Sequence, residues 1–198
     1  MRSTLTGCAL LLAVLGMVSS VSAADEPPSY APTAVPAALK PAVQRAGKAI
    51  GQLQAQLQEK LLAALGEGGQ AAAIRVCKAE APALAATIGK ELGVEVGRTG
   101  FRLRNPSNAP RPWAKPFVVA AAGQKADTVP SRVVDLGGGR VGMLRPIPMM
   151  PMCAGCHGPR DQIDPSVRAT LAQAYPADTA VGFQEGDVRG FFWAEAAP

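Results

Sequence analysis

The chain has 198 residues and a formal net charge of +5 at pH 7. Its basic residues are spread along the sequence without interleaved aromatic residues. This argues against nucleic acid as a partner and fits a mildly basic surface that docks an acidic protein. After the N-terminal segment no stretch is long and apolar enough for a membrane helix, so stable membrane insertion is not expected.

The first 23 residues have the three parts of a secretory signal peptide. Arg2 supplies a short positive region, residues 8–18 are an apolar run, and small residues precede a cleavage site after Ala23. The apolar run is too short to span a bilayer comfortably, since a spanning helix needs about 20 residues. We therefore expect a periplasmic or secreted mature protein of about 175 residues, enough for one domain with its own core.

Residues 24–40 are rich in proline and alanine, which predicts a disordered or extended leader before a domain over residues 41–198. The domain opens with a long helix, because apolar residues recur at steps of three and four from Val43 to Leu61. We expect this stripe to pack on its own domain. The alternative is a dimer seam through residues 42–65, since its first part has heptad spacing.

The remaining elements are predicted from periodicity and turn residues. Residues 70–79 and 84–92 are expected to be helices, residues 94–103 a strand, 113–122 a short helix, 132–136 and 140–144 a hairpin around three glycines, 165–175 a helix and 187–194 a final strand. Helices followed by antiparallel strands indicate an α+β domain with its N-terminal helices packed on one sheet.

One motif carries recognisable chemistry: Cys153, two residues, Cys156 and His157, the attachment signature of c-type haem. Two thiols at this spacing reach the two vinyl groups of one porphyrin, and the next residue lies beneath the ring as the proximal iron ligand. His157 is the only histidine in the chain. Export also fits, because c-type haem is normally attached outside the cytoplasm. The sequence therefore predicts one covalent haem c.

Three other interpretations compete with haem. A structural zinc site would use Cys77, Cys153, Cys156 and His157, but adjacent Cys156 and His157 do not easily wrap one tetrahedral ion. A thioredoxin-like dithiol belongs near a βαβ pattern, whereas this motif follows the proline-broken segment 146–152. The third is a plain disulfide with an incidental histidine.

Several motifs occur in a fixed order along residues 40–195: Ala73–Cys77, Gly97–Thr99 followed by Arg102–Pro110, Arg145–Ile147, Cys153–Gly158 and Gly186–Gly190. With them the chain resembles a bacterial family of exported single-haem domains, long catalogued as a domain of unknown function and related to haem-c sensor modules. The resemblance implies a PAS-like antiparallel sheet with a haem-c-binding loop. It also implies a cysteine as second axial ligand, as in a characterised type of member.

The second axial position has several candidates. Ligation by two histidines is impossible within a chain that has one. Cys77 is left unpaired once Cys153 and Cys156 bind haem, and an unpaired cysteine is unusual in an oxidising compartment. A free cysteine is also often a small buried hydrophobe, and Met143, a lysine, water or an open position are further candidates. The match of Cys77 to the ligand-bearing helix of the family favours Cys77.

Arg98, Arg102 and Arg104 alternate in the predicted strand, so at least two of them share a face. Arg98 and Arg102 are candidates for charge-assisted bonds with haem propionates. The alternative is a solvated strand face.

The predicted function is an exported monohaem c-type cytochrome that passes single electrons to an unidentified redox partner protein. The alternative is a haem-based redox or gas sensor that signals through a separate partner, because the chain carries no output domain. No second titratable cluster accompanies the motif, which disfavours a substrate-converting enzyme.

Overall fold

The computed structural model describes residues 27–198, so the predicted signal peptide (residues 1–23) and the start of the leader lie outside the described residues. The helices are α1 (Lys40–Arg75), α2 (Ala81–Leu92), α3 (Lys115–Ala120), α4 (Ala154–His157) and α5 (Pro165–Ala174). The strands are β1 (Ser29–Tyr30), β2 (Val94–Thr99), β3 (Arg132–Asp135), β4 (Val141–Pro148) and β5 (Val188–Ala196). Within residues 27–198 no helix is long and apolar enough to cross a membrane.

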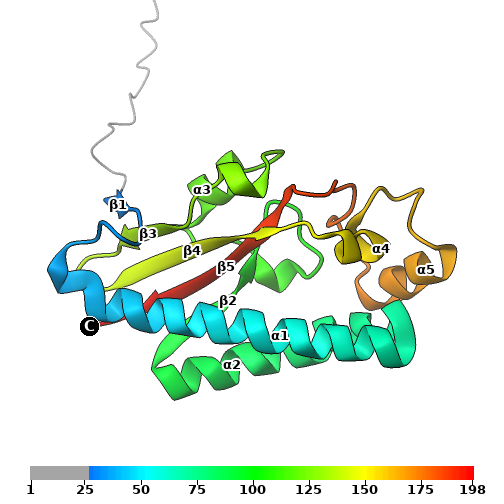
Figure 1. The fold of residues 1–198 in the computed structure, drawn as a ribbon, viewed down its shortest axis with the longest axis horizontal. Helices are drawn as coiled ribbons and strands as arrows, with labels where there is room; N and C mark the ends of the chain where they lie inside the picture. Colours follow the sequence, from blue (N-terminus) through cyan, green and yellow to red (C-terminus); the bar gives the residue numbers. More distant parts are fainter. Residues whose placement is uncertain (1–26) are drawn as a thin grey trace, which may run out of the picture.

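The five strands form one antiparallel sheet in the order β1-β3-β4-β5-β2 (Figure 1). The predicted hairpin is β3–β4, in which Arg132 pairs with Leu144 and Asp135 with Val141. Its turn contains Gly137–Gly139, all three at positive φ, where a Cβ would be strained. The α+β expectation is therefore confirmed.

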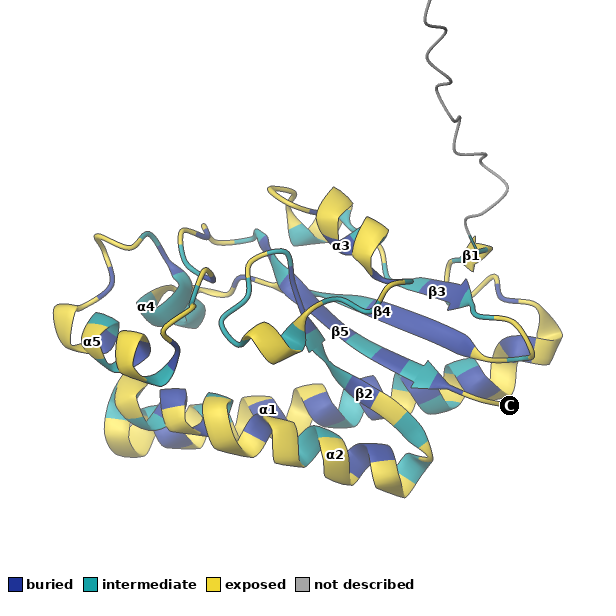
Figure 2. Cartoon of the chain, turned by 180° about the vertical axis from the view of Figure 1, so that it is seen from behind, coloured by how far each residue is buried: buried dark blue, intermediate teal, exposed yellow. Residues whose placement is uncertain are grey.

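Helices cover the two faces of this sheet differently. Along β5, Phe192 and Ala194 belong to the core under α1 and α2, whereas Phe191 and Trp193 pack with the residues around α3. Successive strand residues point to opposite faces, so one strand supplies both cores. Figure 2 shows buried positions along the middle of the sheet and on the inner side of α1.

The long first helix is 36 residues, but Gly68 and Gly69 have non-helical backbone angles. The helix thus breaks at these glycines and resumes to Arg75, which takes in the start of the separate helix predicted over residues 70–79. The apolar stripe, including Ala46, Ile50 and Leu53, is buried in the core against the sheet. The stripe therefore packs within the domain, as the first of the two sequence interpretations has it.

The end of the leader differs from the expected disordered or extended spacer. Tyr30 pairs with Val133 in the sheet, and Val35 and Leu39 are buried in the core. These apolar side chains remove enough surface from water to hold residues 29–39 against the domain.

The predicted strand over residues 94–103 is also shorter than expected. β2 ends at Thr99, and Gly100 lies close to the Arg189 and Gly190 backbone, where the chain leaves the sheet. Arg102 consequently does not share a strand face with Arg98. The alternation of residue types in the sequence continues to residue 103, whereas backbone pairing in the sheet stops at Thr99.

Candidate functional site

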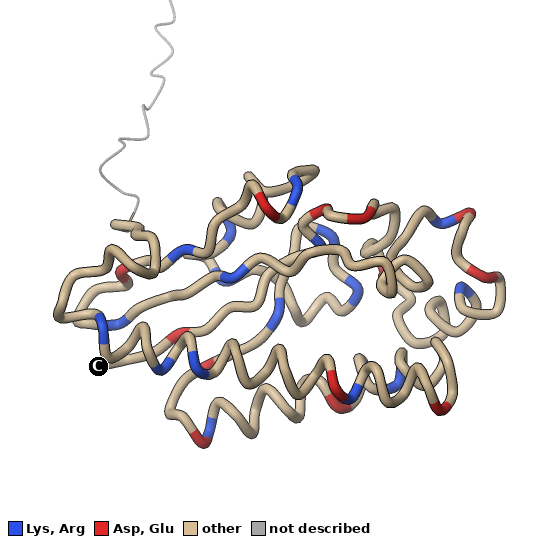
Figure 3. Tube along the Cα trace, viewed as in Figure 1, with Lys and Arg blue, Asp and Glu red and all other residues tan. Residues whose placement is uncertain are grey.

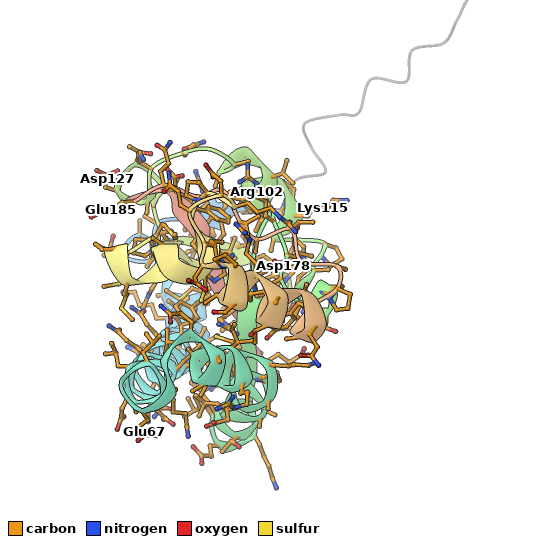
Figure 4. All side chains as sticks on the ribbon, turned by 90° about the vertical axis from the view of Figure 1, so that its right-hand side faces the viewer. Glu67, Arg102, Lys115, Asp127, Asp178 and Glu185 are labelled. Atoms are coloured by element: carbon orange, nitrogen blue, oxygen red, sulfur yellow. The ribbon has the colours of Figure 1, made fainter. Side chains whose placement is uncertain are left out.

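A cavity of about 240 Å³ lies where α1, the end of β2, the end of β4 and the Cys-x-x-Cys-His segment meet. Cys77, Cys153, Cys156 and His157 all line it, and we call it the cysteine–histidine cavity. Much of the remaining wall is apolar, including Leu57, Leu61, Ile74 and Ile147. Figure 4 looks onto this end of the molecule, where α4 and α5 lie above α1.

The Cys-x-x-Cys-His segment forms a compact helical turn. A short 3-10 helix, Pro151–Cys153, runs directly into α4, and the Gly158 N–H closes the turn on the Ala154 carbonyl at 2.9 Å. A Cβ at Gly158 would lie 2.7 Å from that oxygen, so the tight exit requires glycine. The turn brings both cysteines and the histidine to one wall of the cavity.

The ring of His157 is held by Ala180, in the chain before β5, and by Arg189, in β5 itself. Its Nδ1 lies 2.7 Å from the Ala180 carbonyl oxygen and 3.0 Å from the Arg189 Nε. Only one of these can be a hydrogen bond in a given tautomer, because Nδ1 either donates or accepts. The shorter contact, to an oxygen that can only accept, favours a protonated Nδ1. That tautomer leaves a lone pair on Nε2.

Burial and the neighbouring cations keep this imidazole neutral. Removal from water, followed by the charges of Arg189 and Arg104, lowers the pKa of His157 well below its ordinary value of 6.5. A neutral imidazole with a free Nε2 is the form in which histidine binds metals. The Arg104 Nη1 lies 3.4 Å from that Nε2.

Arg104 and Asp178 fasten the motif to the rest of the domain. The Arg104 Nε donates to the Asp178 carboxylate at 2.9 Å, and each side chain is only 10% exposed. The other end of the guanidinium donates to the carbonyls of Cys156 and Ala180. One planar cation therefore spans the motif and the loop that holds His157.

Cys77 lies across the cavity from the motif, in a π-helical turn over Val76–Glu80. Such a turn widens the helix by one residue and is frequent at functional sites. Cys77, Cys153 and Cys156 are all free thiols in the structure. The structure thus brings Cys77 to the same cavity as His157, as the sequence prediction requires.

Two of the three alternative uses of these cysteines, a zinc site and a disulfide, gain no support from this geometry. Among residues 27–198 no group of three or more His, Cys, Asp or Glu side chains is placed to hold a metal ion. The free state of Cys153 and Cys156 does not match a disulfide. Met143, a further candidate ligand, is buried in the main core rather than at the cavity.

The two arginines predicted to bind haem propionates differ in their surroundings. Arg98 and Arg102 both line the cavity, but Arg102 donates to the Val181 carbonyl at 2.8 Å and its guanidinium lies over the Phe183 ring. Arg189 lines the cavity too and was missed by the sequence prediction. Its signal was the motif Gly186–Gly190, which contains Arg189, although periodicity assigned that residue only to a strand.

A second cavity of about 410 Å³ adjoins the first on the Cys77 side. Cys77, Arg98, Asn105 and Asn108 line both cavities. Cys77 therefore has open space on two sides.

Comparison with known proteins supports a specific relationship. The Tll0287-like family model matches residues 15–195. A solved structure, that of the cyanobacterial heme-protein Tll0287, is similar with a TM-score of 0.56 at 26% sequence identity, covering 76% of this chain and 91% of that one. A comparison with curated proteins found no match.

Proposed function

The chain belongs to the Tll0287-like family, and from this premise we propose that it is an exported monohaem c-type cytochrome with His157 and Cys77 as its axial ligands. The observation that carries the proposal is the cysteine–histidine cavity. One wall bears Cys153, Cys156 and His157, Cys77 lies across from it, and apolar residues line much of the space between them.

Covalent attachment needs two free thiols that face one edge of the porphyrin. Each thiol adds across a vinyl double bond: sulfur bonds to one carbon and the thiol proton ends on the other, with no net oxidation. Cys153 and Cys156 are both free and separated by about one helical turn, which suits the addition. The attached motif then carries His157 beneath the ring.

The ligand atom on the motif side would be His157 Nε2. The Ala180 carbonyl accepts from Nδ1–H and so fixes the ring orientation, as partners of metal-bound histidines commonly do. Iron at Nε2 would replace the 3.4 Å contact with Arg104, whose ion pair with Asp178 remains available.

The ligand on the other side would be the Cys77 sulfur. Coordination keeps a thiol deprotonated, and a thiolate stabilises ferric iron more than a neutral ligand does. Bound haem iron supplies one-electron redox chemistry. The chain contributes a fixed pair of ligands and an apolar enclosure, which together favour a low potential and small structural change during electron transfer.

A sensor is the second candidate, and the second cavity favours it. Because that cavity is also lined by Cys77, a small molecule has space next to this ligand. A redox change or a gas that releases Cys77 from iron would move the π-helical turn and alter the surface seen by a partner.

The test begins with the mass of the mature protein. Expression in a periplasm with haem-c maturation is expected to add the mass of one haem that survives acid denaturation. Cys77→Ser is then expected to abolish the thiolate EPR signature of the ferric protein and to raise its potential. A bare polypeptide mass would overturn haem attachment, and an unchanged EPR spectrum in Cys77→Ser would exclude Cys77 as ligand. Carbon monoxide binding by the reduced wild-type protein would favour the sensor over the electron carrier.

A further inference from the structure

The cysteine–histidine cavity is lined by four arginines and by no aspartate or glutamate. Two of the four have partners, because Arg104 is ion-paired with Asp178 and Arg102 donates to main-chain carbonyls. Arg98 and Arg189 have no ion pair within residues 27–198. These guanidinium groups share one cavity wall that has no carboxylate of its own, so this wall is suited to an anion.

In the tautomer of His157 that can bind iron, Arg189 loses a possible hydrogen-bond acceptor. When His157 Nδ1–H donates to Ala180, Nδ1 cannot also accept from the Arg189 Nε–H that lies 3.0 Å away. Arg189 is then a half-buried guanidinium over the Phe183 ring, and its nearest polar contact offers no acceptor. It is free to bond an acceptor inside the cavity.

Thr99 supplies an independent observation. Its side chain is 5% exposed, it lines the same cavity, and its Oγ1 is a buried atom with no hydrogen-bond partner. A buried hydroxyl without a partner is unusual and indicates a missing group. Thr99 follows Arg98 as the last residue of β2, so the two side chains leave the cavity end of the strand on opposite faces. Thr99 pairs across the sheet with Phe191, two residues from Arg189.

We propose that Arg98, Thr99 and Arg189 form a carboxylate-binding site that holds one propionate of the haem. A carboxylate accepts from a hydroxyl and two guanidinium groups at once, and charge-assisted bonds of this kind are strong. The inference rests on the proposed function. It replaces Arg102, the second arginine of the sequence prediction, with Arg189 and adds Thr99.

Chemical modification of the holoprotein tests the site directly. A carbodiimide with a small amine converts an accessible carboxylate to an amide, and the elements of water go to the carbodiimide. Trypsin then releases residues 141–160, because the Arg145–Pro146 bond resists cleavage. This peptide carries Cys153 and Cys156 and contains no Asp or Glu. Amidation acquired before digestion therefore reports on haem carboxylates alone.

One haem carboxylate is expected to react slowly in folded wild-type protein and quickly after unfolding. Arg189→Gln and Arg98→Gln are expected to speed its amidation by roughly tenfold or more, the scale of one lost charge-assisted bond. Thr99→Val keeps the side-chain shape and is expected to give a smaller increase. Arg102→Gln, at an arginine with other partners, is the matched control and is expected to react like wild type.

The outcomes separate this site from the proposed function. A 141–160 peptide without haem mass would contradict the proposed function, and the site with it. A haem-bearing peptide whose two carboxylates react equally fast in folded and unfolded protein would overturn the site alone. The site alone would also be overturned if Thr99→Val and Arg189→Lys both kept the wild-type protection of the haem carboxylate. These substitutions alter the hydrogen bonds to the carboxylate with little change of side-chain volume or charge.

Discussion

The two ends of this domain are built on different principles. The end that carries β1, β3 and the start of α1 is a regular apolar core, in which Ile50, Val133 and Val141 are fully buried. The other end holds the cysteine–histidine cavity, with a π-helical turn, short helices and four arginines that are half-buried or exposed. The first end is held by non-directional burial, whereas the second depends on a few directional bonds. Figure 3 shows that charged residues of both signs are otherwise scattered along the trace.

The largest expected effect tests burial in the core between the sheet and α3. Phe191 is 2% exposed and packs between β5 and α3. Phe191→Ala is expected to lower the unfolding free energy by about 4 kcal/mol, from lost burial and an unfilled cavity. Because this core lies outside the cavity, chemical denaturation should give a similar loss for haem-bearing and haem-free protein. A loss confined to one of the two would show that the ends are not independent.

The next effect tests the directional end. Asp178→Asn leaves Arg104 without its anion at a site where both side chains are 10% exposed. Breaking a buried pair on one side is expected to cost about 3 kcal/mol of unfolding free energy, measured by chemical denaturation. Glu80→Gln is the matched control, because it breaks the half-exposed pair with Lys60 and should leave the midpoint almost unchanged. Equal effects of the two substitutions would contradict the anchoring role of Asp178.

The pH dependence of the unfolding free energy is expected to differ between the haem-free and the haem-bearing protein, because His157 lies at the cavity end. The pKa of His157 is lowered in the folded haem-free chain, so below pH 6.5 the unfolded state takes up a proton that the folded state resists. Stability present above pH 6.5 is therefore lost as the pH falls, at up to about 1.4 kcal/mol per pH unit for this one proton. His157→Gln should remove this component of the slope, and a ligated imidazole in the holoprotein should lack it. An identical slope in wild type and His157→Gln would assign it to other groups.

The smallest expected effect is that of a surface substitution on α1, outside both the apolar core and the cavity. Leu62 is 50% exposed on α1 despite its size. Leu62→Ala is expected to change the unfolding free energy by less than about 0.5 kcal/mol, because the side chain removes little surface from water. A thermal melt is sufficient to check it. A shift of the melting temperature as large as that of Phe191→Ala would mean that this surface is covered in solution.

Sequence reasoning was strongest where structure is local. The α1 stripe and the glycine turn of the β3–β4 hairpin follow from periodicity and turn chemistry, and both are confirmed. The pairing of Thr99 with Phe191 was not predictable, because it joins residues far apart in sequence. Alternation therefore extended the predicted β2 to residue 103, past the turn at Gly100.

In the candidate site, too, the sequence identified residues that are close together in the chain and missed those that are far apart. The Cys-x-x-Cys-His motif identified Cys153, Cys156 and His157 because their chemistry lies in adjacent residues. Arg104 and Arg189 reach His157 from 53 and 32 residues away, and no spacing rule marks such contacts. Asp178 has no motif of its own and acquires its role only through Arg104. The fold had to be known before these residues could be assigned.

The two-residue strand β1 also determines how the molecule meets other copies of itself. Ser29 and Tyr30 pair with Val134 and Val133, two fully buried valines of the neighbouring strand β3. A chain trimmed past Tyr30 would present the free backbone donors and acceptors of a β-branched strand, which is a template for edge-to-edge aggregation. This short segment thus acts as a protective cover, and colloidal stability depends on keeping it intact.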